Sequence, residues 1–386
     1  MKKFITALIF VAFFTDSYCY DFSKVDSLVL SAISQKYFPG AALIVANDHD
    51  VLYEKYYGSF TYDSDSKPVD QNSLFDLASV TKVVATTSAI MILHEKGLID
   101  LDEFVWKYFP DFKINGKEYT TVKNLLLHNS GLPAWIPFYK TCKTKGNVFD
   151  TICTLTPKFT PGSDFLYSDL NFIMLGFLVE KISGITLDEF CDENLFKPLG
   201  MRETTFCPEL NKREFCLPTE YDAVWRQRQL QGEVHDEAAS LLGGISGNAG
   251  LFSTARDLAF FMQMLLNEGK YYNPYSSGLK DEQMFKPETV RLFTQKFFTM
   301  NYDNTRAFGW DTKQPPVGRF PSQCGELISD KCFGHTGYTG TSVWCDKQRG
   351  IYIIFLTNRV YPSRSNDGIK YVRPDLHNLI FNILTN

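Results

Sequence analysis

A serine and a lysine at the start of a predicted helix are the first residues whose types and spacing could do chemistry. In LASVTKVVATTSAIMILHEKG, Ser79 and Lys82 are three residues apart, so both side chains lie on one helical face. A serine hydroxyl is a poor nucleophile at neutral pH, and an adjacent cation or base corrects this. The helix N-terminus also directs backbone N–H groups toward a developing oxyanion. A capping serine before a surface lysine would give the same pattern, so the pair needs support from elsewhere in the chain.

Two further motifs give that support, in order along the chain. FLYSDLNFIMLG places Tyr167 in a loop immediately before a predicted helix. CFGHTGYTGTSVWCD places His335, Thr336 and Gly337 just before or on a predicted strand.

With these three motifs, the chain resembles the penicillin-recognising serine hydrolases, the family of class C β-lactamases, DD-peptidases and esterases. The motifs of that family are Ser-x-x-Lys, Tyr-x-Asn and Lys/His-Thr-Gly. The resemblance covers most of the chain and includes NLLLHNSGLP, VHDEAASLLGGISGNAGLFSTARDLA, FGW at Phe308 to Trp310, and LTNRVYP. The string from Gly247 to Ser253 is most similar to the penicillin-binding protein 4B branch, whose members are assigned as D-alanyl-D-alanine carboxypeptidases.

The resemblance implies an acyl-enzyme mechanism. Ser79 attacks a carbonyl carbon, and the backbone N–H groups of Ser79 and Tyr338 form the oxyanion hole. Lys82 and Tyr167 together carry out the proton transfers. Lowering a phenol pKa from about 10 by about 2 to 3 units takes roughly 3–4 kcal/mol, which one charge about 4 Å away supplies at an effective dielectric constant near 20. His335 is a second candidate cation, because a histidine changes its charge near neutral pH.

Two positions depart from the family pattern. His335 stands where β-lactamases of this class usually have Lys, which favours peptide or ester substrates. Asp169 stands where Asn is usual, and an ionised Asp offers no donor to a substrate amide. Asp169 could instead pair with Lys82 or attract a cationic substrate group, and Asn171 could replace the missing amide. The resemblance assigns substrate contacts to Asp169, His335, Thr336 and Gly337.

Several other polar residues have simpler structural interpretations. His128, between an apolar run and a turn, is expected to be a buried structural histidine. His235, Asp236 and Glu237 fit no common metal-ligand spacing and are interpreted as polarity at a loop or helix start. The glycines of GGISGNAG are expected to give backbone freedom rather than a phosphate cradle. No metal and no other cofactor is expected.

The elements around the motifs predict an α/β (α+β) fold of the β-lactamase/transpeptidase type. Residues 20–58 contain a helix and then a β-hairpin, and the last 45 or so residues contain two strands and a helix. We expect a central antiparallel sheet built from both ends of the chain (about 20–78 and 300–386) and flanked by helices. A mostly helical subdomain (about 79–299) is inserted between them.

The composition limits the classes of function. The chain has 386 residues and a formal net charge of −5, with no long run of Lys or Arg, so nucleic-acid binding is not expected. Lys2 and Lys3 precede a short apolar run, which predicts a signal peptide over residues 1–19 and a secreted, periplasmic or cell-surface protein. No later segment predicts a membrane span.

Removal of the signal peptide would leave eight cysteines, an even number that is compatible with disulfide bonds in an exported protein. The pairs that are near in sequence are Cys142–Cys153, Cys207–Cys216 and Cys324–Cys332. Eight cysteines allow 105 connectivities, so the pairing stays open.

Three functions remain open at this stage. The first is a D-alanyl-D-alanine carboxypeptidase or esterase, the second a β-lactamase, and the third a penicillin-recognising binding protein without turnover. The expected partner is accordingly a small molecule or peptide: a D-Ala-D-Ala peptide, an ester or a β-lactam.

Overall fold

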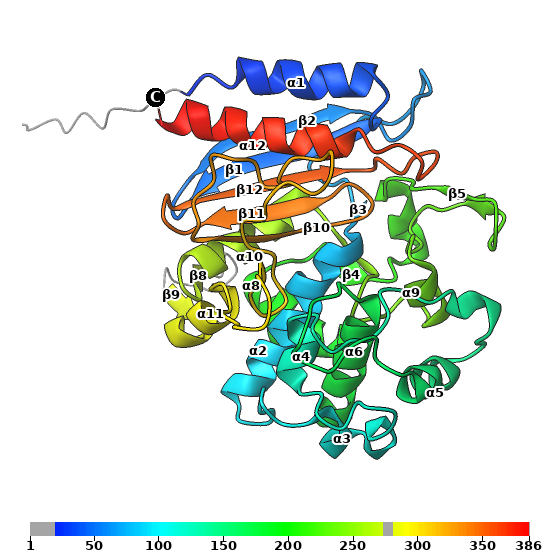
Figure 1. Ribbon diagram of the computed structural model, residues 1–386. Coiled ribbons are helices and arrows are strands. Elements are labelled where there is room, and N and C mark those ends of the chain that lie inside the picture. Colours follow the sequence, from blue (N-terminus) through cyan, green and yellow to red (C-terminus); the bar gives the residue numbers. More distant parts are fainter. Residues whose placement is uncertain (1–19, 273–280, 386) are drawn as a thin grey trace, which may run out of the picture.

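The computed structural model describes residues 20–272 and 281–385 and contains a central sheet with helices on both faces (Figure 1). The predicted signal peptide, residues 1–19, lies outside the described residues. One face of the sheet carries the first and last helices, and the other contacts a large, mainly helical part from the middle of the chain. The predicted fold class, an antiparallel sheet with flanking helices and an inserted helical part, is confirmed.

The strands of the central sheet come from both ends of the chain, as predicted. They are β1 (Gly40–Asn47), β2 (Val51–Gly58), β10 (Cys332–Thr336), β11 (Ser342–Asp346) and β12 (Ile351–Thr357). Their order is β10-β11-β12-β1-β2, and every neighbouring pair is antiparallel. The two ends join where β1 pairs with β12, from Ala41 opposite Thr357 to Asn47 opposite Ile351.

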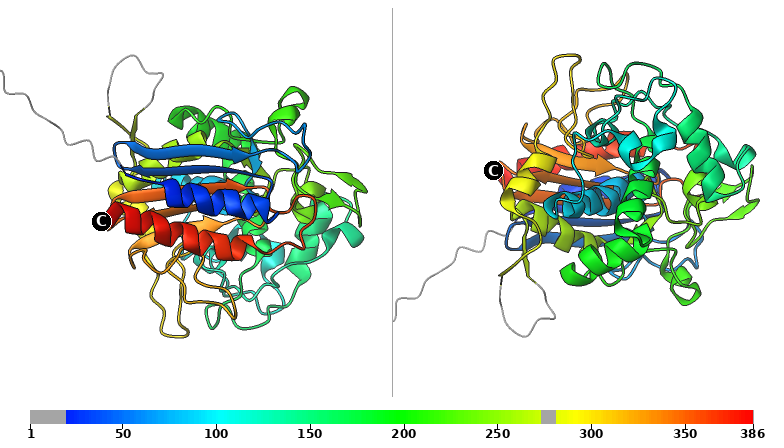
Figure 2. Two further views of the ribbon diagram at one scale, coloured as in Figure 1. Left: turned by 90° about the horizontal axis from the view of Figure 1, so that it is seen from above. Right: turned by 90° about the horizontal axis from the view of Figure 1, so that it is seen from below.

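Alternate side chains of β1 enter two hydrophobic cores, because successive residues of a strand point to opposite faces. Leu43 and Val45 belong to the core beneath α1 and α12, which lie side by side on one face (Figure 2). Ile44 and Ala46 belong to the core on the other face, which α10 covers. The covering helices are α1 (Ser23–Ser34), α10 (Ala255–Leu266) and α12 (Ile369–Thr385). Burial on both faces explains the nearly continuous apolar runs of these strands.

The central helix of the helical part carries the first motif. It consists of η1 (Ala78–Val80), the π-helical stretch η2 (Lys82–Thr87) and α2 (Ser88–Glu95), which confirms the helix predicted from Ser79 to about Lys96. π-Helical turns are rare and occur frequently at functional sites. The helix packs against α6 (Asp169–Ser183), which follows the second motif.

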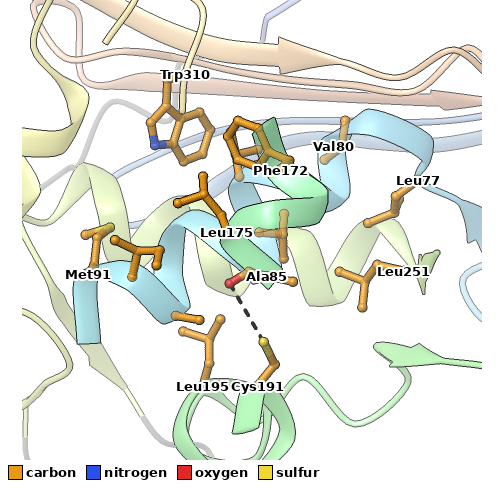
Figure 3. Close-up of a cluster of buried hydrophobic side chains, with 14 of the residues drawn as sticks. Leu77, Val80, Ala85, Met91, Phe172, Leu175, Cys191, Leu195, Leu251 and Trp310 are labelled. Atoms are coloured by element: carbon orange, nitrogen blue, oxygen red, sulfur yellow. Dashed lines mark hydrogen bonds between the residues drawn. The ribbon is translucent and has the colours of Figure 1, made fainter. Parts of the chain in front are cut away.

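Apolar side chains surround this pair of helices on all sides (Figure 3). Val80 and Ala85 belong to one buried cluster with Phe172 and Leu175 of α6, and Trp310 lies on the side of the cluster toward the sheet. The cluster holds the first and second motifs in a fixed relation to each other, because interiors of this kind are close-packed.

The remaining elements are short. The helices are α3 (Val105–Tyr108), α4 (Val122–Leu126), α5 (Lys145–Thr154), α7 (Leu187–Cys191), α8 (Lys197–Leu199), α9 (Glu237–Leu241) and α11 (Pro287–Thr294), with further turns η3 (Pro110–Phe112), η4 (Phe138–Lys140), η5 (Asp192–Phe196) and η6 (Leu210–Phe215). The small sheets are β3 (Phe75–Asp76) with β7 (Leu251–Ser253) and β4 (Thr205–Phe206), β5 (Tyr221–Asp222) with β6 (Arg228–Gln229), and β8 (Lys270–Tyr272) with β9 (Asp281–Gln283).

Among residues 20–272 and 281–385, no single helix is long and apolar enough to cross a membrane. The bent pair formed by α6 and Leu187–Leu199 passes such a test by length and composition, and α6 is part of the buried core. Within the same residues, no group of three or more His, Cys, Asp or Glu side chains is arranged to hold a metal ion.

Candidate active site

The turn that presents Ser79 is held by hydrogen bonds from several distant segments. Ala78 has a positive φ of 47°, a conformation that non-glycine residues adopt rarely. The Ala78 N–H donates to the Asp76 carboxylate (2.9 Å), and the Thr339 hydroxyl donates to the Asp76 carbonyl (2.7 Å). The Thr341 hydroxyl donates to the next carbonyl, that of Leu77 (2.9 Å). The third-motif loop therefore fixes the backbone on which the serine sits.

The Lys82 ammonium lies beside the Ser79 hydroxyl and is completely buried. Its Nζ is 2.9 Å from Ser79 Oγ, 2.7 Å from Asp169 Oδ1 and 2.9 Å from the Asn248 carbonyl oxygen. An ammonium has three N–H donors and no acceptor, so these three contacts use all of its hydrogen-bonding capacity. Burial alone lowers the pKa of Lys82, but its ion pair with Asp169 and its hydrogen-bonding contact with Tyr167 outweigh burial and raise that pKa, so Lys82 is protonated at rest.

Asp169 and Asn171 occupy different places. Asp169 is the first residue of α6 and pairs with Lys82, one of the two roles considered for it. Asn171 is completely buried, where its side chain accepts from the Ser130 hydroxyl (2.5 Å) and contacts His128 Nδ1 (3.4 Å). Asn171 is not among the residues that line the cleft beside Ser79, so it does not replace the missing amide.

The Tyr167 ring lies between His128 and the cations of the site. It stacks on the His128 ring at 4.4 Å between centroids, and Lys82 Nζ is 5.2 Å from the Tyr167 centroid. The phenol is in side-chain hydrogen-bonding contact with Ser79. Burial raises the pKa of Tyr167, and the Lys82 charge offsets only part of that rise. The phenol is therefore neutral at rest, in contrast to the expectation that Lys82 lowers its pKa, because burial and the Asp169 charge oppose the effect of the Lys82 charge.

His128 is a structural residue, as predicted. It is completely buried, and its Nδ1 accepts from the Ser168 N–H at 3.0 Å. Burial, followed by the nearby Arg306 charge, holds the pKa of His128 far below its usual value, so the imidazole is neutral. Its contact with the backbone of the second motif fixes the loop that carries Tyr167.

An arginine that the motifs did not identify is the second cation of the site. Arg306 is buried, its guanidinium is paired with Asp311, and Nη2 donates to the Gly309 carbonyl (3.0 Å). The guanidinium carbon lies 5.6 Å from the Tyr167 ring centroid. Arg306 and Asp311 flank the FGW string that is part of the family resemblance. This pair of opposite charges beside the string is the sequence signal that could have identified the second cation.

His335 is not the second cation. It is buried at the end of β10, with Nδ1 placed 2.8 Å from the Thr336 carbonyl oxygen. A carbonyl only accepts, so Nδ1 carries the hydrogen and Nε2 has a free lone pair. Burial, with the Arg306 and Lys82 charges and against the opposing Asp311 charge, lowers the pKa of His335 to about 4. The imidazole is therefore neutral near pH 7, which corrects the expectation that its charge changes there.

The third motif brings the Tyr338 backbone close to the nucleophile. A Cβ on Gly337 would collide with the Thr341 hydroxyl and the Leu77 carbonyl, so only glycine allows this approach. The Gly337 N–H donates to the Thr341 carbonyl (2.7 Å), which turns the chain after β10. The Tyr338 side chain is half exposed and lies between His235 and Arg359.

A cleft of about 730 Å³ opens beside Ser79 and joins these parts. Tyr167, Arg306, His335 and Thr336 line it near the serine. Its apolar wall comes mainly from the loop that precedes β10, with one residue from the loop before α6, and its far end is lined by four cations. The apolar residues are Phe165, Pro315, Val317, Phe320 and Pro321, and the cations are Arg359, Arg364, Lys370 and Arg373.

Two of these cations are buried without a carboxylate partner in the part of the chain that the structure describes. Arg359 donates to the carbonyls of Tyr338 (2.7 Å), Arg364 (3.1 Å) and Asn366 (2.6 Å). Arg373 donates to the Gln323 side chain (3.1 Å) and the Thr341 carbonyl (3.2 Å). Burial and the Arg359 charge lower the pKa of Arg373 to about 9, so it remains cationic at neutral pH. Asp367 also lines the cleft and its charge acts on Arg359, but neither Arg359 nor Arg373 is ion-paired among the described residues, so this end suits an anionic ligand group.

All eight cysteines of the described part are free thiols. Cys324 and Cys332 are in side-chain contact, whereas Cys142 contacts Thr151 (3.5 Å) and Cys207 contacts the Gly243 carbonyl (3.1 Å). Of the three pairs near in sequence, the structure brings only Cys324 and Cys332 together.

Comparisons with known proteins agree with this fold. The sequence profile of the β-lactamase family matches residues 25–376. A "Putative D-alanyl-D-alanine carboxypeptidase" of Escherichia coli O157:H7 is 33% identical over 355 residues, which cover 83% of this chain and 79% of that protein. An "N-acetylmuramyl-L-alanine amidase" of Bacillus subtilis (strain 168) is 33% identical over 368 residues, covering 87% and 80%.

The fold is also similar to solved structures. The octameric penicillin-binding protein homologue of Pyrococcus abyssi superposes with a TM-score of 0.71 at 22% identity, over 94% of this chain and 78% of that one. Together with the family match, these findings show that the chain belongs to the β-lactamase family of serine hydrolases.

Proposed function

We propose that the protein hydrolyses its substrate through an acyl-enzyme on Ser79 and acts as a D-alanyl-D-alanine carboxypeptidase or on related esters. The observation that carries this proposal is the fully buried Lys82 ammonium, 2.9 Å from Ser79 Oγ at the wall of the cleft. Burying a cation beside a serine hydroxyl lowers the stability of the fold, so its presence there favours a functional role. Activation of the nucleophile is such a role.

The proton path follows from the contacts of Lys82. Because the ammonium has no lone pair, it must first give a proton to Asp169 before Nζ can accept the proton of Ser79. Ser79 Oγ then bonds to the carbonyl carbon, and the carbonyl electron pair moves to the oxygen. The N–H groups of Ser79 and Tyr338 are the proposed donors to that oxyanion.

Collapse of the tetrahedral intermediate breaks the bond to the leaving group. The neutral phenol of Tyr167 gives that group its proton, and Lys82 returns a proton to Tyr167. Water then attacks the acyl carbon and gives a proton to the neutral amine of Lys82, which passes it to Ser79 Oγ as the acid product leaves. Asp169 finally returns its proton to Lys82, which restores the resting ion pair. His335, Thr336 and Gly337 contact the substrate in this scheme, and the neutral His335 does so as an acceptor through Nε2.

The cationic end of the cleft supports a leaving group that carries a carboxylate. Arg359 and Arg373 lack an anionic partner among the described residues, and the C-terminal D-alanine of a peptide would supply one. The names of the curated relatives, a carboxypeptidase and an amidase, agree with an amide substrate.

A β-lactamase is the second candidate, because the carboxylate of a β-lactam would suit the same cationic end. Asp169 weighs against it, since its carboxylate is occupied by Lys82 and gives a β-lactam amide no donor. A binding protein without turnover is the third, and the same experiment separates all three.

The test is intact-protein mass spectrometry of the protein and of its Ser79→Ala variant after exposure to a penicillin, to p-nitrophenyl acetate and to a D-Ala-D-Ala peptide. We expect a Ser79 adduct with the penicillin and release of D-alanine from the peptide. Rapid penicillin turnover would favour the β-lactamase, and an adduct without turnover of any substrate would indicate the binding protein. An equal adduct on Ser79→Ala would exclude Ser79 as the nucleophile.

Export and disulfide formation are part of the same proposal. The basic and apolar residues of 1–19 and the even number of remaining cysteines support a signal peptide and an oxidising compartment. The side-chain contact of Cys324 and Cys332 makes that pair the first to examine. N-terminal sequencing of the protein recovered from its native host, with non-reducing peptide mapping, tests both points.

A further inference from the structure

Asp236 has contacts beyond the helix start that the sequence predicts for it. It does cap α9: its Oδ1 accepts from the Ala239 N–H at 2.8 Å. The same oxygen also accepts from Nδ2 of Asn248 at 3.2 Å. The carbonyl oxygen of Asn248 is one of the three acceptors of the Lys82 ammonium. Asn248 thus connects Asp236 with Lys82, the lysine beside the nucleophile.

The segment around Asn248 lies tightly along the helix that carries Lys82. The Gly247 carbonyl accepts from the Thr86 hydroxyl (2.8 Å), and the Leu251 N–H donates to the Thr81 hydroxyl (3.1 Å). A Cβ on Gly247 would collide with the Phe172 carbonyl of α6. The segment is therefore confined between the two helices of the site.

The side-chain hydrogen bonds of Asn248 fix the orientation of its backbone carbonyl within this confined segment. Asn248 is 1% exposed, and its Oδ1 accepts from the Ser246 hydroxyl at 2.7 Å. Asp236 accepts from the other end of the amide. A buried amide held at both ends cannot turn without leaving a polar group unsatisfied.

Two charged groups act on Asp236 from the elements around it, Asp169 from α6 and Glu237 from its own helix, and Lys82 of η2 contacts the carbonyl of its partner Asn248. The Glu237 charge is offset by Arg364 at 2.8 Å, and the Asp169 charge by Lys82 at 2.7 Å. Burial, together with the Asp169 charge, raises the pKa of Asp236 to about 6. Asp236 therefore gains its charge just below neutral pH.

We propose that ionised Asp236 is a positioning residue for acylation: through Asn248 it holds Lys82 in place beside Ser79, and its charge repels that of Asp169 and so favours transfer of a Lys82 proton to Asp169. The inference rests on the acyl-enzyme chemistry proposed for Ser79. The second carboxylate disfavours the separated charges of the Lys82–Asp169 pair by repelling the negative charge on Asp169. Lys82 Nζ loses one proton, Asp169 gains it, and Nζ then accepts the proton of Ser79. Acylation consequently slows as the pH falls through about 6, where Asp236 becomes protonated.

The test uses Asp236→Asn in the full chain. Asparagine is as good an N-cap as aspartate and still offers an oxygen to Asn248, so mainly the charge is removed. Acylation by a fluorescent penicillin and hydrolysis of p-nitrophenyl acetate are measured from about pH 5 to about pH 8. We expect an acid limb near pH 6 in the wild type. In Asp236→Asn we expect a rate at least about tenfold lower above that limb and no limb at all.

Asp257→Asn is the matched control. Asp257 is also a buried carboxyl in the first turn of a helix, and burial raises its pKa to about 6 as well. Its partners, the Glu203 N–H (2.8 Å) and the Thr204 hydroxyl (2.9 Å), lie outside the site. Asp257→Asn is expected to keep the acid limb. Loss of the limb in this control would overturn the inference, because the limb would then report general stability.

Two further results separate the inference from the proposed function. If the penicillin and the ester do not label Ser79 of the wild type, the proposed function fails and the inference fails with it. If the wild type is labelled and Asp236→Asn keeps both its rate and its acid limb, only the inference is overturned. Should Asp236→Asn not fold by circular dichroism, Asp236→Ser, which keeps a good N-cap but loses the charge, replaces it with the same expected profile.

Discussion

The two ends of the cleft hold their cations in opposite ways. Next to Ser79, Lys82 has a carboxylate, a carbonyl and a hydroxyl as acceptors, and Arg306 is paired with Asp311. At the far end, Arg359 and Arg373 donate to carbonyls and an amide but to no carboxylate among the described residues. Lys82, whose donors are satisfied within the protein and whose ammonium can release a proton, is suited to moving protons, whereas a cation without a paired carboxylate is suited to binding an anion.

The difference separates chemistry from recognition within one cleft. Changes at the paired end should alter the rate for every substrate, because each substrate needs the same activated serine. Changes at the unpaired end should alter only those substrates that bring a carboxylate. The predictions below test this separation, beginning with the largest expected effect.

Lys82→Met should slow acylation by on the order of 10³-fold for all substrates. Methionine has a similar length, but its uncharged side chain cannot give or accept a proton. The measurement is the pre-steady-state labelling rate with a fluorescent penicillin. Lys117→Met is the control: Lys117 is equally buried, but its ammonium donates to the Ile114 carbonyl (2.9 Å) and the Leu155 carbonyl (2.5 Å), outside the site. Equal losses in both variants would show a folding defect instead.

Asp169→Asn should slow ester hydrolysis by about 10²-fold, since Asn cannot take the proton that Lys82 must release. The same change supplies an amide donor, so penicillin acylation should fall less than ester hydrolysis. Steady-state kinetics with p-nitrophenyl acetate and a penicillin measure the two effects. An unchanged ester rate would remove Asp169 from the proton path.

Arg373→Gln should lower kcat/KM for a D-Ala-D-Ala peptide by about tenfold and leave a neutral ester nearly unaffected. Glutamine retains donors for the Thr341 carbonyl, so the local backbone should hold. The ratio of the two kcat/KM values is the readout. A similar loss for both substrates would mean that Arg373 supports the structure and not the carboxylate.

His335→Gln should change the rates only about threefold and leave the shape of the pH profile between about pH 5 and pH 8 unaltered. The imidazole is neutral throughout that range because its pKa is lowered to about 4, so its protonation is lost before the range begins. A pH titration of ester hydrolysis in both proteins checks this. Disappearance of a limb near neutral pH would assign the limb to His335.

Local patterns were sufficient to predict the architecture and the three motifs. The hairpin of β1 and β2 and the helices from Ser79 and Asp169 follow apolar periods that are visible in the sequence. The order of Ser79, Tyr167 and His335 along the chain placed them in one site, and the structure brings them together at one cleft.

Charge states and long-range partners could not be predicted in the same way. Arg306 and Asp311 lie beside the FGW string in a loop without periodicity, and only tertiary structure sets the guanidinium beside Tyr167. The charge of His335 depends on burial and on neighbouring cations from other elements, neither of which spacing reveals. The contact of Asp236 with Asn248 likewise joins the start of α9 to the glycine-rich segment that follows this helix.

The pairing of β1 with β12 has a consequence for biosynthesis. These strands lie near opposite ends of the polypeptide, so the edge that carries His335 can dock only after nearly the whole chain has been synthesised. A ribosome-bound or C-terminally shortened chain would possess the serine but lack the strand that completes its pocket. The pocket beside Ser79 is therefore complete only once β12 has been synthesised and has paired with β1.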